Sequence, residues 1–463
     1  MDLKIFLLSL CLCIVVSTCN RVYVHPFNLF AYNQTECEQI EMENHTIGKM
    51  VIPIPIESKM KHEEHSIKVK TNQATHHLGS SESYLTSLIN ALGFRAFQAW
   101  KEIHSRDTML ISFTNFYWSI LSFYLGASGE TAVSLQRLLG FENPSESTSC
   151  TSQVNSLKVI SKLKNIDSFL VSEDGNFVMK KTVCIFVSPN FPLSEKFIHD
   201  LEPTSDNLYV RAVDFTNSAN AVNSIHEFLD AQLPNKLRSG LSVVDETSNL
   251  MYVSHIYYKG KVSKSNLLPE PKQFWIEPNK QILVPMISVS GEFQFKDDKI
   301  TNQIVLKIYV SENDFLLLVQ PTNGNTLENM ESSFTNKDWQ ALSWMDGLVS
   351  RHIQLTIPKL EIERFYDAKD LVTKMGLPTL LGKNAHFGKL NNKEINIGKI
   401  INIIHFKLED SGADHEKYKA DTRNDEEPME VNFNQPFTLV LFEGTTKAFT
   451  LLGRIVNPLN QGI

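Results

Sequence analysis

The feature that most constrains the fold is a nearly continuous apolar stretch at residues 115–127 of this 463-residue chain. Aromatic and aliphatic side chains occupy almost every side of the helix that this stretch would form. A helix that is apolar all round has to be buried inside a large fold. Two small residues within it, Ser119 and Ser122, predict that other elements approach the helix closely. The sequence therefore indicates a large body with a buried central helix.

A second, amphipathic helix is expected to open this body, with Ser83 as its N-cap. Apolar residues recur after it at helical spacing: Leu85, Leu88, Ile89, Leu92, Ala96 and Trp100. The preceding segment, residues 30–83, has little that would pack by itself, because Pro53 and Pro55 exclude a central strand and the rest is polar and unpatterned. We therefore expect a tail at 30–83 and one folded domain at 84–463.

The first 19 residues are predicted to be a secretory signal. Lys4 precedes an apolar run at residues 5–16, and the small residues Ser17 and Cys19 stand at positions compatible with cleavage. This run is too short to span a membrane, and no later stretch is long and apolar enough to do so. We therefore expect a secreted, extracellular product without membrane insertion, beginning at Asn20.

Cysteine usage fits an oxidising compartment. Cys11, Cys13 and Cys19 leave with the predicted signal, so one bridge and one free thiol remain among three cysteines, with three possible pairings. Cys184 lies in a strand-like apolar run and is predicted to be a buried, small hydrophobic residue. The polar surroundings of the other two, Cys37 and Cys150, favour a bridge between them.

Other chemistry is sparse. Asn33 and Asn44 begin glycosylation sequons in the tail, where an exposed acceptor is expected. The net charge of −8, without a Lys/Arg cluster, argues against nucleic-acid binding. No phosphate loop, His-Glu-x-x-His or Cys-x-x-Cys motif occurs, and the tail histidines His62, His65, His76 and His77 lack a fixed ligand spacing. We expect no catalytic residue, metal or cofactor, and no enzyme activity.

An unusual stretch follows the predicted signal at residues 20–32. Anchoring side chains alternate along it, as in an extended peptide that a receptor with pockets binds: Arg21, Tyr23, His25 and Phe27. Pro26 removes a hydrogen-bond donor and biases His25 toward extended backbone, so we expect no helix in this stretch. The stretch continues into Leu29 and Phe30, a large apolar pair of the kind that aspartic proteases cleave.

Several motifs resemble the serpin family in the family's order. They are residues 115–131, 252–260, 355–362, 366–370, 433–437 and 453–458. The resemblance covers roughly residues 84–460. It implies an α+β (mixed α/β) serpin fold, with about three β-sheets and eight or nine helices, preceded by an extended N-terminal tail.

The serpin resemblance also places a reactive-loop hinge at residues 409–420. Inhibitory serpins insert the cleaved loop into the central sheet, which requires small, uncharged residues in the hinge. Here insertion would bury charged side chains in either register, at a cost of several kcal/mol for each unpaired charge. The positions that make the hinge degenerate are Glu409, Ser411, Gly412, Asp414, Glu416 and Lys417. We therefore predict no protease inhibition, with a hormone- or ligand-transport serpin as the alternative and a serine-protease inhibitor as the weaker one.

The amino-terminal stretch resembles the angiotensin peptides. Residues 20–29 are similar to angiotensin I and residues 20–27 to angiotensin II, the vasoactive octapeptide. This resemblance implies a hormone precursor that renin cleaves at Leu29–Phe30, and a released peptide that angiotensin-converting enzyme cuts at Phe27–Asn28. A heptahelical receptor would bind the octapeptide, Asn20, Arg21, Val22, Tyr23, Val24, His25, Pro26 and Phe27.

The same resemblance implies a role for the expected bridge between Cys37 and Cys150. In such precursors it acts as a redox switch for renin access, and a plain structural staple stays open as the alternative. The peptide carries two departures from its commonest form, Asn20 in place of an Asp and Asn28 in place of a His. The first lies outside the Arg-to-Phe core of the octapeptide, and the second is discarded when the octapeptide is formed.

Overall fold

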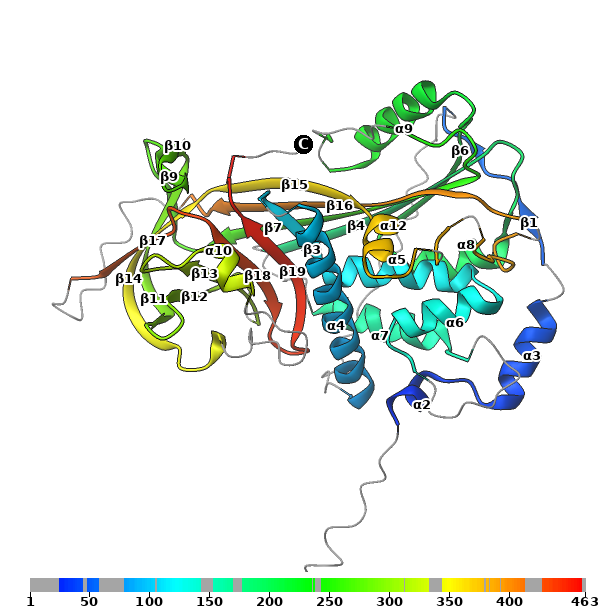
Figure 1. Ribbon diagram of the computed structural model, residues 1–463, viewed down its shortest axis with the longest axis horizontal. Coiled ribbons are helices and arrows are strands. Elements are labelled where there is room, and N and C mark those ends of the chain that lie inside the picture. Colours follow the sequence, from blue (N-terminus) through cyan, green and yellow to red (C-terminus); the bar gives the residue numbers. More distant parts are fainter. Residues whose placement is uncertain are drawn as a thin grey trace, which may run out of the picture.

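The computed structural model (Figure 1) describes most of the chain. The described residues are 25–44, 48–57, 79–104, 106–142, 153–169, 177–234, 236–237, 243–311, 313–332, 344–378, 380–382, 384–391, 393–412 and 427–459. Among the helices of these ranges, none combines the length and the apolar character that crossing a membrane requires.

Two large sheets form the body. In the six-stranded sheet the order is β15-β16-β7-β4-β6-β2, and β16 and β7 run parallel at its centre. The nine-stranded sheet follows the path β17-β14-β11-β12-β13-β18-β19-β3, with β8 pairing β11 off this path. Two small sheets pair β1 with β5 and β9 with β10. This mixed α/β architecture confirms the expected fold class.

The strands of the described residues have the following bounds: β1 Met50–Val51, β2 Ile54–Pro55, β3 Met109–Ser112, β4 Phe177–Val187, β5 Leu193–Ser194, β6 Asn207–Ala212, β7 Leu250–Val262, β8 Asn266–Leu267, β9 Lys272–Glu277, β10 Lys280–Val284, β11 Met286–Asp298, β12 Gln303–Tyr309, β13 Asp314–Pro321, β14 Val349–Pro358, β15 Leu360–Asp367, β16 Ile397–Asp410, β17 Met429–Asn432, β18 Phe437–Glu443 and β19 Ala448–Ile455.

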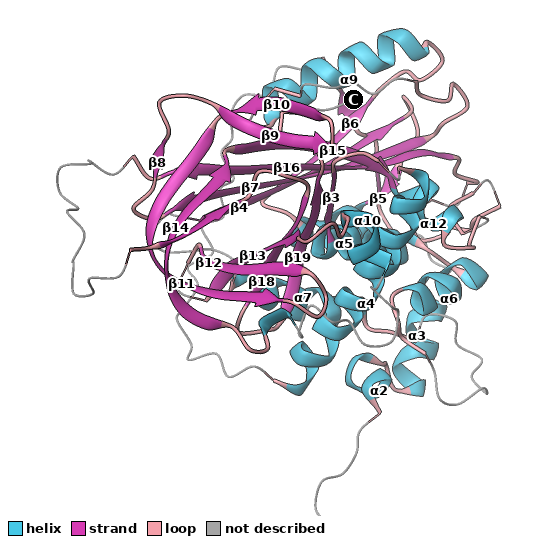
Figure 2. Cartoon of the chain, turned by 60° about the vertical axis from the view of Figure 1, so that its left-hand side comes forward, coloured by secondary structure: helices cyan, strands magenta, loops and turns pink. Residues whose placement is uncertain are grey.

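Most helices gather on one side of the six-stranded sheet, whereas α9 lies across its other face (Figure 2). Their bounds are α2 Pro26–Phe30, α3 Gln34–Asn44, α4 Ser80–Ile103, α5 Phe113–Gly126, α6 Gly129–Leu138, α7 Ser156–Ser168, α8 Glu195–Leu201, α9 Ser218–Gln232, α10 Leu327–Ser332 and α12 Ala368–Lys374, with a 3-10 turn η1 at Glu202–Thr204.

The central helix is α5, and every one of its residues is buried, as its all-round apolar sequence predicts. Ser112 caps it by accepting a hydrogen bond from the Asn115 backbone. Its small residue Ser119 donates to Asn402 of β16 at 2.7 Å. Ser122 lies 3.3 Å from the hydroxyl of Tyr252 on β7. The two serines therefore let the central sheet approach α5, as expected.

The opening helix of the body begins earlier than the sequence suggested. It starts at Ser80 with Gly79 as its N-cap, and the expected cap Ser83 lies inside its first turn. Glu82 in this first turn accepts an ion pair from Lys162 of α7 at 2.7 Å. A carboxylate is favourable near a helix N-terminus. Glu82 lies in the first turn of the helix, which the prediction leaves outside it.

The expectation that residues 30–83 pack little is wrong for several segments. Strand β1 pairs with β5, and β2 pairs with β6 as the last strand of the six-stranded sheet. Ile56, directly after β2, is buried in the apolar cluster under α9. The prolines are compatible with this position, because β2 is an edge strand and needs hydrogen-bond donors on one side only. A central strand stays excluded, as predicted.

Candidate functional site

The predicted scissile bond, Leu29–Phe30, lies inside a short helix. The expectation of a non-helical stretch is therefore wrong from Pro26 onward, where α2 begins. Proline is well suited to the first helical position, since its fixed φ matches the helix and its missing N–H needs no partner there. His25 before it is extended, with ψ at 132°, as a residue before proline should be. Its Nδ1 accepts from the Phe27 backbone at 3.3 Å.

Two aromatic side chains on α2 anchor this helix in the body. Phe27 and Phe30 are 5% and 1% exposed and belong to the main apolar core. The Phe30 ring meets the ring of Phe141 edge to face, with centroids 5.5 Å apart. Leu29 between them is half-buried, and Asn28 is exposed. In Figure 1, α2 lies below α4 and α7, the two helices on which it packs.

The chain after the predicted scissile bond is held by backbone hydrogen bonds. Ala31 and Val154 form an isolated antiparallel bridge. On one side of the bridge Asn155 N donates to Phe30 O at 2.7 Å, and on the other Tyr32 N donates to Gln153 O at 2.8 Å. Phe30, Ala31 and Tyr32 therefore lie against residues 153–155, which lead into α7.

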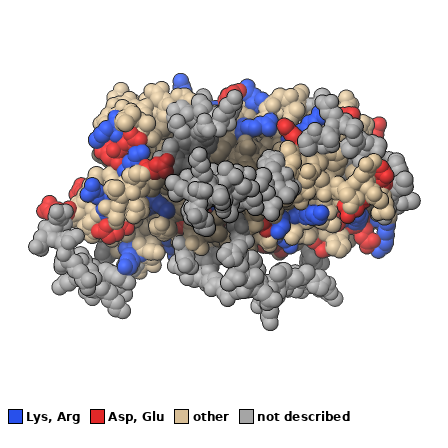
Figure 3. All heavy atoms as spheres, turned by 90° about the horizontal axis from the view of Figure 1, so that it is seen from below, with Lys and Arg blue, Asp and Glu red and all other residues tan. Residues whose placement is uncertain are grey.

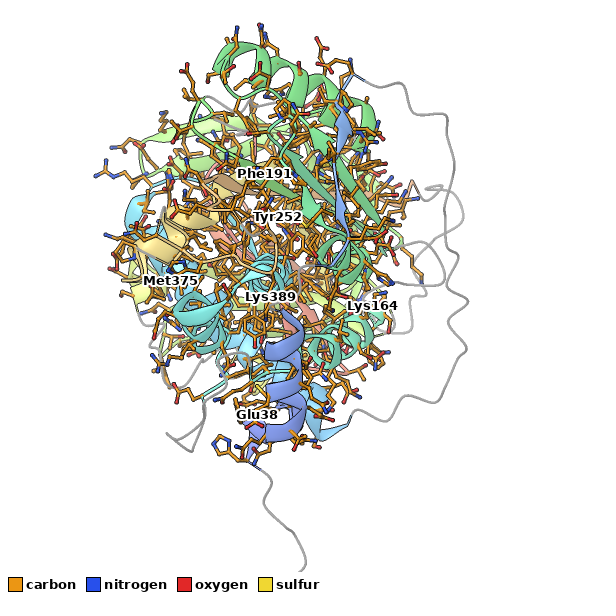
Figure 4. The ribbon with its side chains drawn as sticks, turned by 90° about the vertical axis from the view of Figure 1, so that its right-hand side faces the viewer. Glu38, Lys164, Phe191, Tyr252, Met375 and Lys389 are labelled. Atoms are coloured by element: carbon orange, nitrogen blue, oxygen red, sulfur yellow. The ribbon has the colours of Figure 1, made fainter. Side chains whose placement is uncertain are left out.

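Helix α3 follows directly and carries two of the predicted site residues. Asn33 is exposed and caps the helix by accepting from Glu36 N at 2.8 Å, while the Glu36 carboxylate accepts from Asn33 N at 3.1 Å. Figure 4 shows α3 at the lower front of the molecule, with Glu38 on it. Asn44 is the last residue of α3. The two sequon asparagines therefore stand at the two ends of one helix.

The cysteines divide as their surroundings suggested. Cys184 on β4 is buried and free, which confirms that prediction. Cys37 on α3 is 3% exposed and disulfide-bonded. Its expected partner Cys150 lies outside the described residues, so the pairing stays a prediction. Other predicted site residues also lie outside the described ranges: Asn20, Arg21, Val22, Tyr23, Val24, Asp414, Glu416 and Lys417.

The expected hinge begins at the end of β16, where the described residues reach Gly412. β16 stays paired with β7 to the last position, with Asp410 opposite Val262. Glu409 accepts ion pairs from Lys407 at 2.7 Å and from Lys259 of β7 at 3.0 Å. The two lysines, with hydrogen bonds, lower the pKa of Glu409 against the opposing effect of its partial burial.

A second connection closes the same end of the sheet. The Ser411 side chain accepts from Ser265 N at 3.0 Å and donates to Ser265 O at 3.2 Å, and Ser411 N donates to the Ser265 hydroxyl at 3.3 Å. Ser265 follows β7 and is fully buried. The described part of the hinge therefore continues the contact between β16 and the β7 side of the sheet.

The described residues hold no group of three or more potential metal ligands. On the face shown in Figure 3, basic and acidic side chains alternate over the coloured atoms. The described residues therefore supply no cluster that would bind a metal ion.

Sequence reasoning missed the residues that hold the predicted scissile bond. Phe141 follows α6, and residues 153–155 precede α7, far along the chain from residue 30. One available signal was the all-buried helix α5 itself, because the hydroxyl of a buried Tyr124 has to find a hydrogen-bond partner. That partner is Val154.

Comparison with known proteins agrees with this architecture. The family model described as "Serpin (serine protease inhibitor)" matches residues 87–458. Angiotensinogen of Bos taurus is 30% identical over 455 residues, which are 95% of this chain and 94% of that protein. Angiotensinogen of Homo sapiens is 30% identical over 459 residues, with the same coverage. The crystal structure of mouse protein-Z dependent protease inhibitor superposes with a TM-score of 0.67 at 20% identity, over 82% of this chain and 98% of that one. The chain therefore belongs to the serpin family, and within that family it is an angiotensinogen homologue.

Proposed function

We propose that this chain is a secreted hormone precursor, and that renin cuts it between Leu29 and Phe30 to release an angiotensin I-like decapeptide. One observation carries the proposal: the bond that resembles the renin site lies in a five-residue helix whose attachment to the body is local. An isolated helix of this length is not stable in water, so α2 depends on the packing of Phe27 and Phe30. A segment of this kind can leave the body without unfolding it.

Opening of α2 has to precede cleavage. An aspartic protease binds its substrate as an extended strand of about eight residues. Centred on the Leu29–Phe30 bond, such a strand runs from Pro26 to Asn33. We call these eight residues the cleavage segment. In the closed form this segment is helical up to Phe30 and its largest side chains are buried. Renin therefore acts on the fraction of molecules in which the segment has left the body.

The later steps follow from the chemistry of the released peptide. Angiotensin-converting enzyme removes Asn28 and Leu29, and the octapeptide then ends in a carboxylate on Phe27. Pro26 limits the conformations of the free peptide and so lowers the ordering cost of binding to a heptahelical receptor. The peptide controls blood pressure and salt balance, while the chain itself has no enzymatic role.

Around the peptide, the division of the chain supports secretion and presentation. Residues 1–19 serve as the signal peptide, 20–29 as the peptide, 30–83 as the connecting extension and 84–463 as the serpin domain. Glycans are carried at Asn33 and Asn44. Asn33 caps the start of α3, and Asn44 is its last residue.

The disulfide of Cys37 is proposed to involve Cys150 and to regulate renin access. Residues 151–155 connect Cys150 to the segment that holds Phe30, Ala31 and Tyr32. A bridge from Cys37 would therefore close a small loop around these contacts and limit how far residues 30–36 move away. Equal rates of renin cleavage in the wild type and in Cys150→Ser would leave only the structural-staple role.

The serpin body is proposed to be non-inhibitory. Insertion of the loop requires β7 and β16 to separate, against a ladder that is complete to Asp410 and the contacts of Glu409 and Ser411. The charged hinge residues add the cost of burial. Incubation with serine proteases tests this part, because a covalent complex stable in SDS would overturn it. A transport serpin fits the same hinge but leaves residues 20–29 unexplained.

Mass spectrometry of the products released by renin tests the main proposal. The full mature chain and a synthetic peptide of residues 20–33 are digested in parallel. We expect one released decapeptide, ending at Leu29, from both substrates, with slower release from the protein because its segment is closed. An amino terminus that stays intact in the protein while the peptide is cut would refute the function.

A further inference from the structure

We propose that Tyr124 of the central helix α5 is a positioning residue for the cleavage reaction, because it fixes the segment that holds the residues after the predicted scissile bond. This inference rests on the proposed cleavage at Leu29–Phe30. It adds a residue remote from the peptide that sets how much of the precursor renin can use.

The Tyr124 hydroxyl contacts both peptide groups of one residue. It donates to Val154 O at 3.1 Å and accepts from Val154 N at 3.2 Å. The side chain is 2% exposed, and burial raises the pKa of Tyr124, so the hydroxyl keeps the proton that it donates. A second possible acceptor, Gln136 Oε1 of α6, lies 3.4 Å away. The hydroxyl thus fastens Val154 to the middle of the body.

Val154 in turn faces the chain after the scissile bond. In its bridge with Ala31 the hydrogen bonds are made by the flanking residues, Phe30 with Asn155 and Tyr32 with Gln153. A non-hydrogen-bonded pair in an antiparallel bridge points its own peptide groups away from the partner. Val154 therefore offers these groups to α5, and Tyr124 satisfies both of them.

This arrangement gives three consecutive steps from the core to the substrate. Tyr124 holds Val154, the residues on either side of Val154 hold Phe30 and Tyr32, and Phe30 is the residue whose amide bond renin would cut. The segment is fixed on its other side by α7, since Asn155 Oδ1 accepts from Lys158 N at 3.0 Å. Loss of the Tyr124 hydroxyl would leave this second attachment intact. Residues 153–155 would therefore become more mobile but would stay on the body.

The expected consequence is easier opening of the cleavage segment. Renin binds only the open form, so the apparent KM equals the KM of the open form divided by the open fraction. If residues 153–155 move together with the cleavage segment, removing the two hydrogen bonds between Tyr124 and Val154 raises the open fraction of the cleavage segment by about tenfold. KM should fall by that factor while kcat stays the same, because the cleaved sequence and the protease are unchanged.

The test compares Tyr124→Phe with the matched control Tyr258→Phe in the full mature chain. Tyr258 on β7 is fully buried, and its hydroxyl lies 2.9 Å from Ser112 Oγ, at the end of α5 opposite to Tyr124. Both variants lose one buried hydroxyl, so a general loss of stability affects both. We expect a KM for renin about tenfold lower in Tyr124→Phe alone.

Each outcome decides one of the two proposals. If renin fails to cut the wild type after Leu29 although it cuts the peptide of residues 20–33, the proposed function fails. If the wild type is cut but Tyr124→Phe and Tyr258→Phe have the same KM, or Tyr124→Phe has the higher one, the positioning role is wrong and the proposed function stands.

Amide hydrogen exchange in the wild type gives a second test that needs no variant. If Tyr124 fixes the segment, the amides of Tyr32, Val154 and Asn155 open together and exchange with similar protection. Exchange at Tyr32 and Asn155 more than about tenfold faster than at Val154 would show that the cleavage segment opens while Tyr124 stays bonded. That result overturns the inference even if Tyr124→Phe does not fold.

Discussion

Two segments of this molecule correspond to sites that proteases attack in related proteins, and they are attached to the body in different ways. The first is the cleavage segment, Pro26 to Asn33, which includes α2. The second is the end of β16, where the reactive loop of a serpin begins. The first is held by two aromatic side chains and a single β-bridge. The second belongs to a ladder between β16 and β7 that continues to Asp410.

Under the proposed function, this difference accounts for release of a peptide from a fold whose central sheet stays closed. A short helix that packs through two side chains opens at a cost well below that of global unfolding. Separation of β16 from β7 breaks many backbone hydrogen bonds at once, so it costs more free energy than release of α2. In the proposed function, the cleavage segment therefore opens alone while the central sheet stays closed.

The largest expected difference between the two regions is in how their stability depends on pH, because His255 lies on β7. The side chain is 2% exposed, and burial, assisted by the nearby His405, lowers the pKa of His255 to about 3. His405 is itself flanked by Glu361 and Glu363 at 3.9 Å each. Below pH 6.5 the unfolded chain therefore takes up a proton that the folded sheet refuses. Stability present above pH 6.5 is lost toward pH 3, by about 3 kcal/mol at pH 4.

Urea unfolding at pH 7, 5 and 4 measures this effect in the wild type and in His255→Phe. The variant should lose most of the acid-dependent decrease, because no imidazole remains to be protonated. Tyr32 amide protection, corrected for the intrinsic pH dependence of exchange, should change far less than the unfolding free energy. An equal pH slope in both proteins would mean that the sheet does not sense acid through His255.

A smaller effect is expected at the contact between the cleavage segment and the body. Phe141→Ala removes the ring that Phe30 meets, while leaving the renin recognition sequence unchanged. An aromatic pair contributes about 1 kcal/mol beyond its buried area, so renin should cleave the variant about fivefold faster. The measurement is kcat/KM on the full chain at low substrate concentration.

Phe387→Ala is the matched control for this comparison. Phe387 is also a buried phenylalanine in an edge-to-face pair, with Phe123 at 5.8 Å, but that pair is separate from the cleavage segment. It should lower the global stability without changing renin cleavage. Similar acceleration in both variants would show that cleavage follows global unfolding, and the distinction between the two regions would be lost.

The sequence predicted the sheet region well because its signals are local. An all-round apolar helix has to be buried, and the motif order of the serpins fixes the elements around it. Cys184 and the serines of α5 took the expected places for the same reason. Strand pairing follows once the fold is known, since alternate residues of β7 and β16 face the two apolar clusters.

Prediction of the cleavage segment failed where position within an element matters. Pro26 excludes a helix interior but suits a helix start, and nothing in residues 20–30 says which applies. For α3 a signal existed: Asn33 and Glu36 form a capping box, although the helix has no apolar stripe to support it. The bridge to Val154 joins residues far apart in sequence, and no local pattern encodes it.

The smallest expected effect concerns the ion pairs at the end of β16. Glu409→Gln removes the charge that Lys259 and Lys407 share, yet all three side chains are partly exposed to water. Water and salt screen such pairs, so the unfolding free energy in urea should fall by less than about 1 kcal/mol. The variant should also form no covalent complex with a trypsin-like protease, because the backbone ladder and the remaining hinge charges are untouched. Lys196→Met, which removes an exposed pair with Asp200, sets the background for a surface charge. A loss above about 2 kcal/mol in Glu409→Gln alone would mean that the ion pairs, and not the β16–β7 ladder, keep the sheet closed.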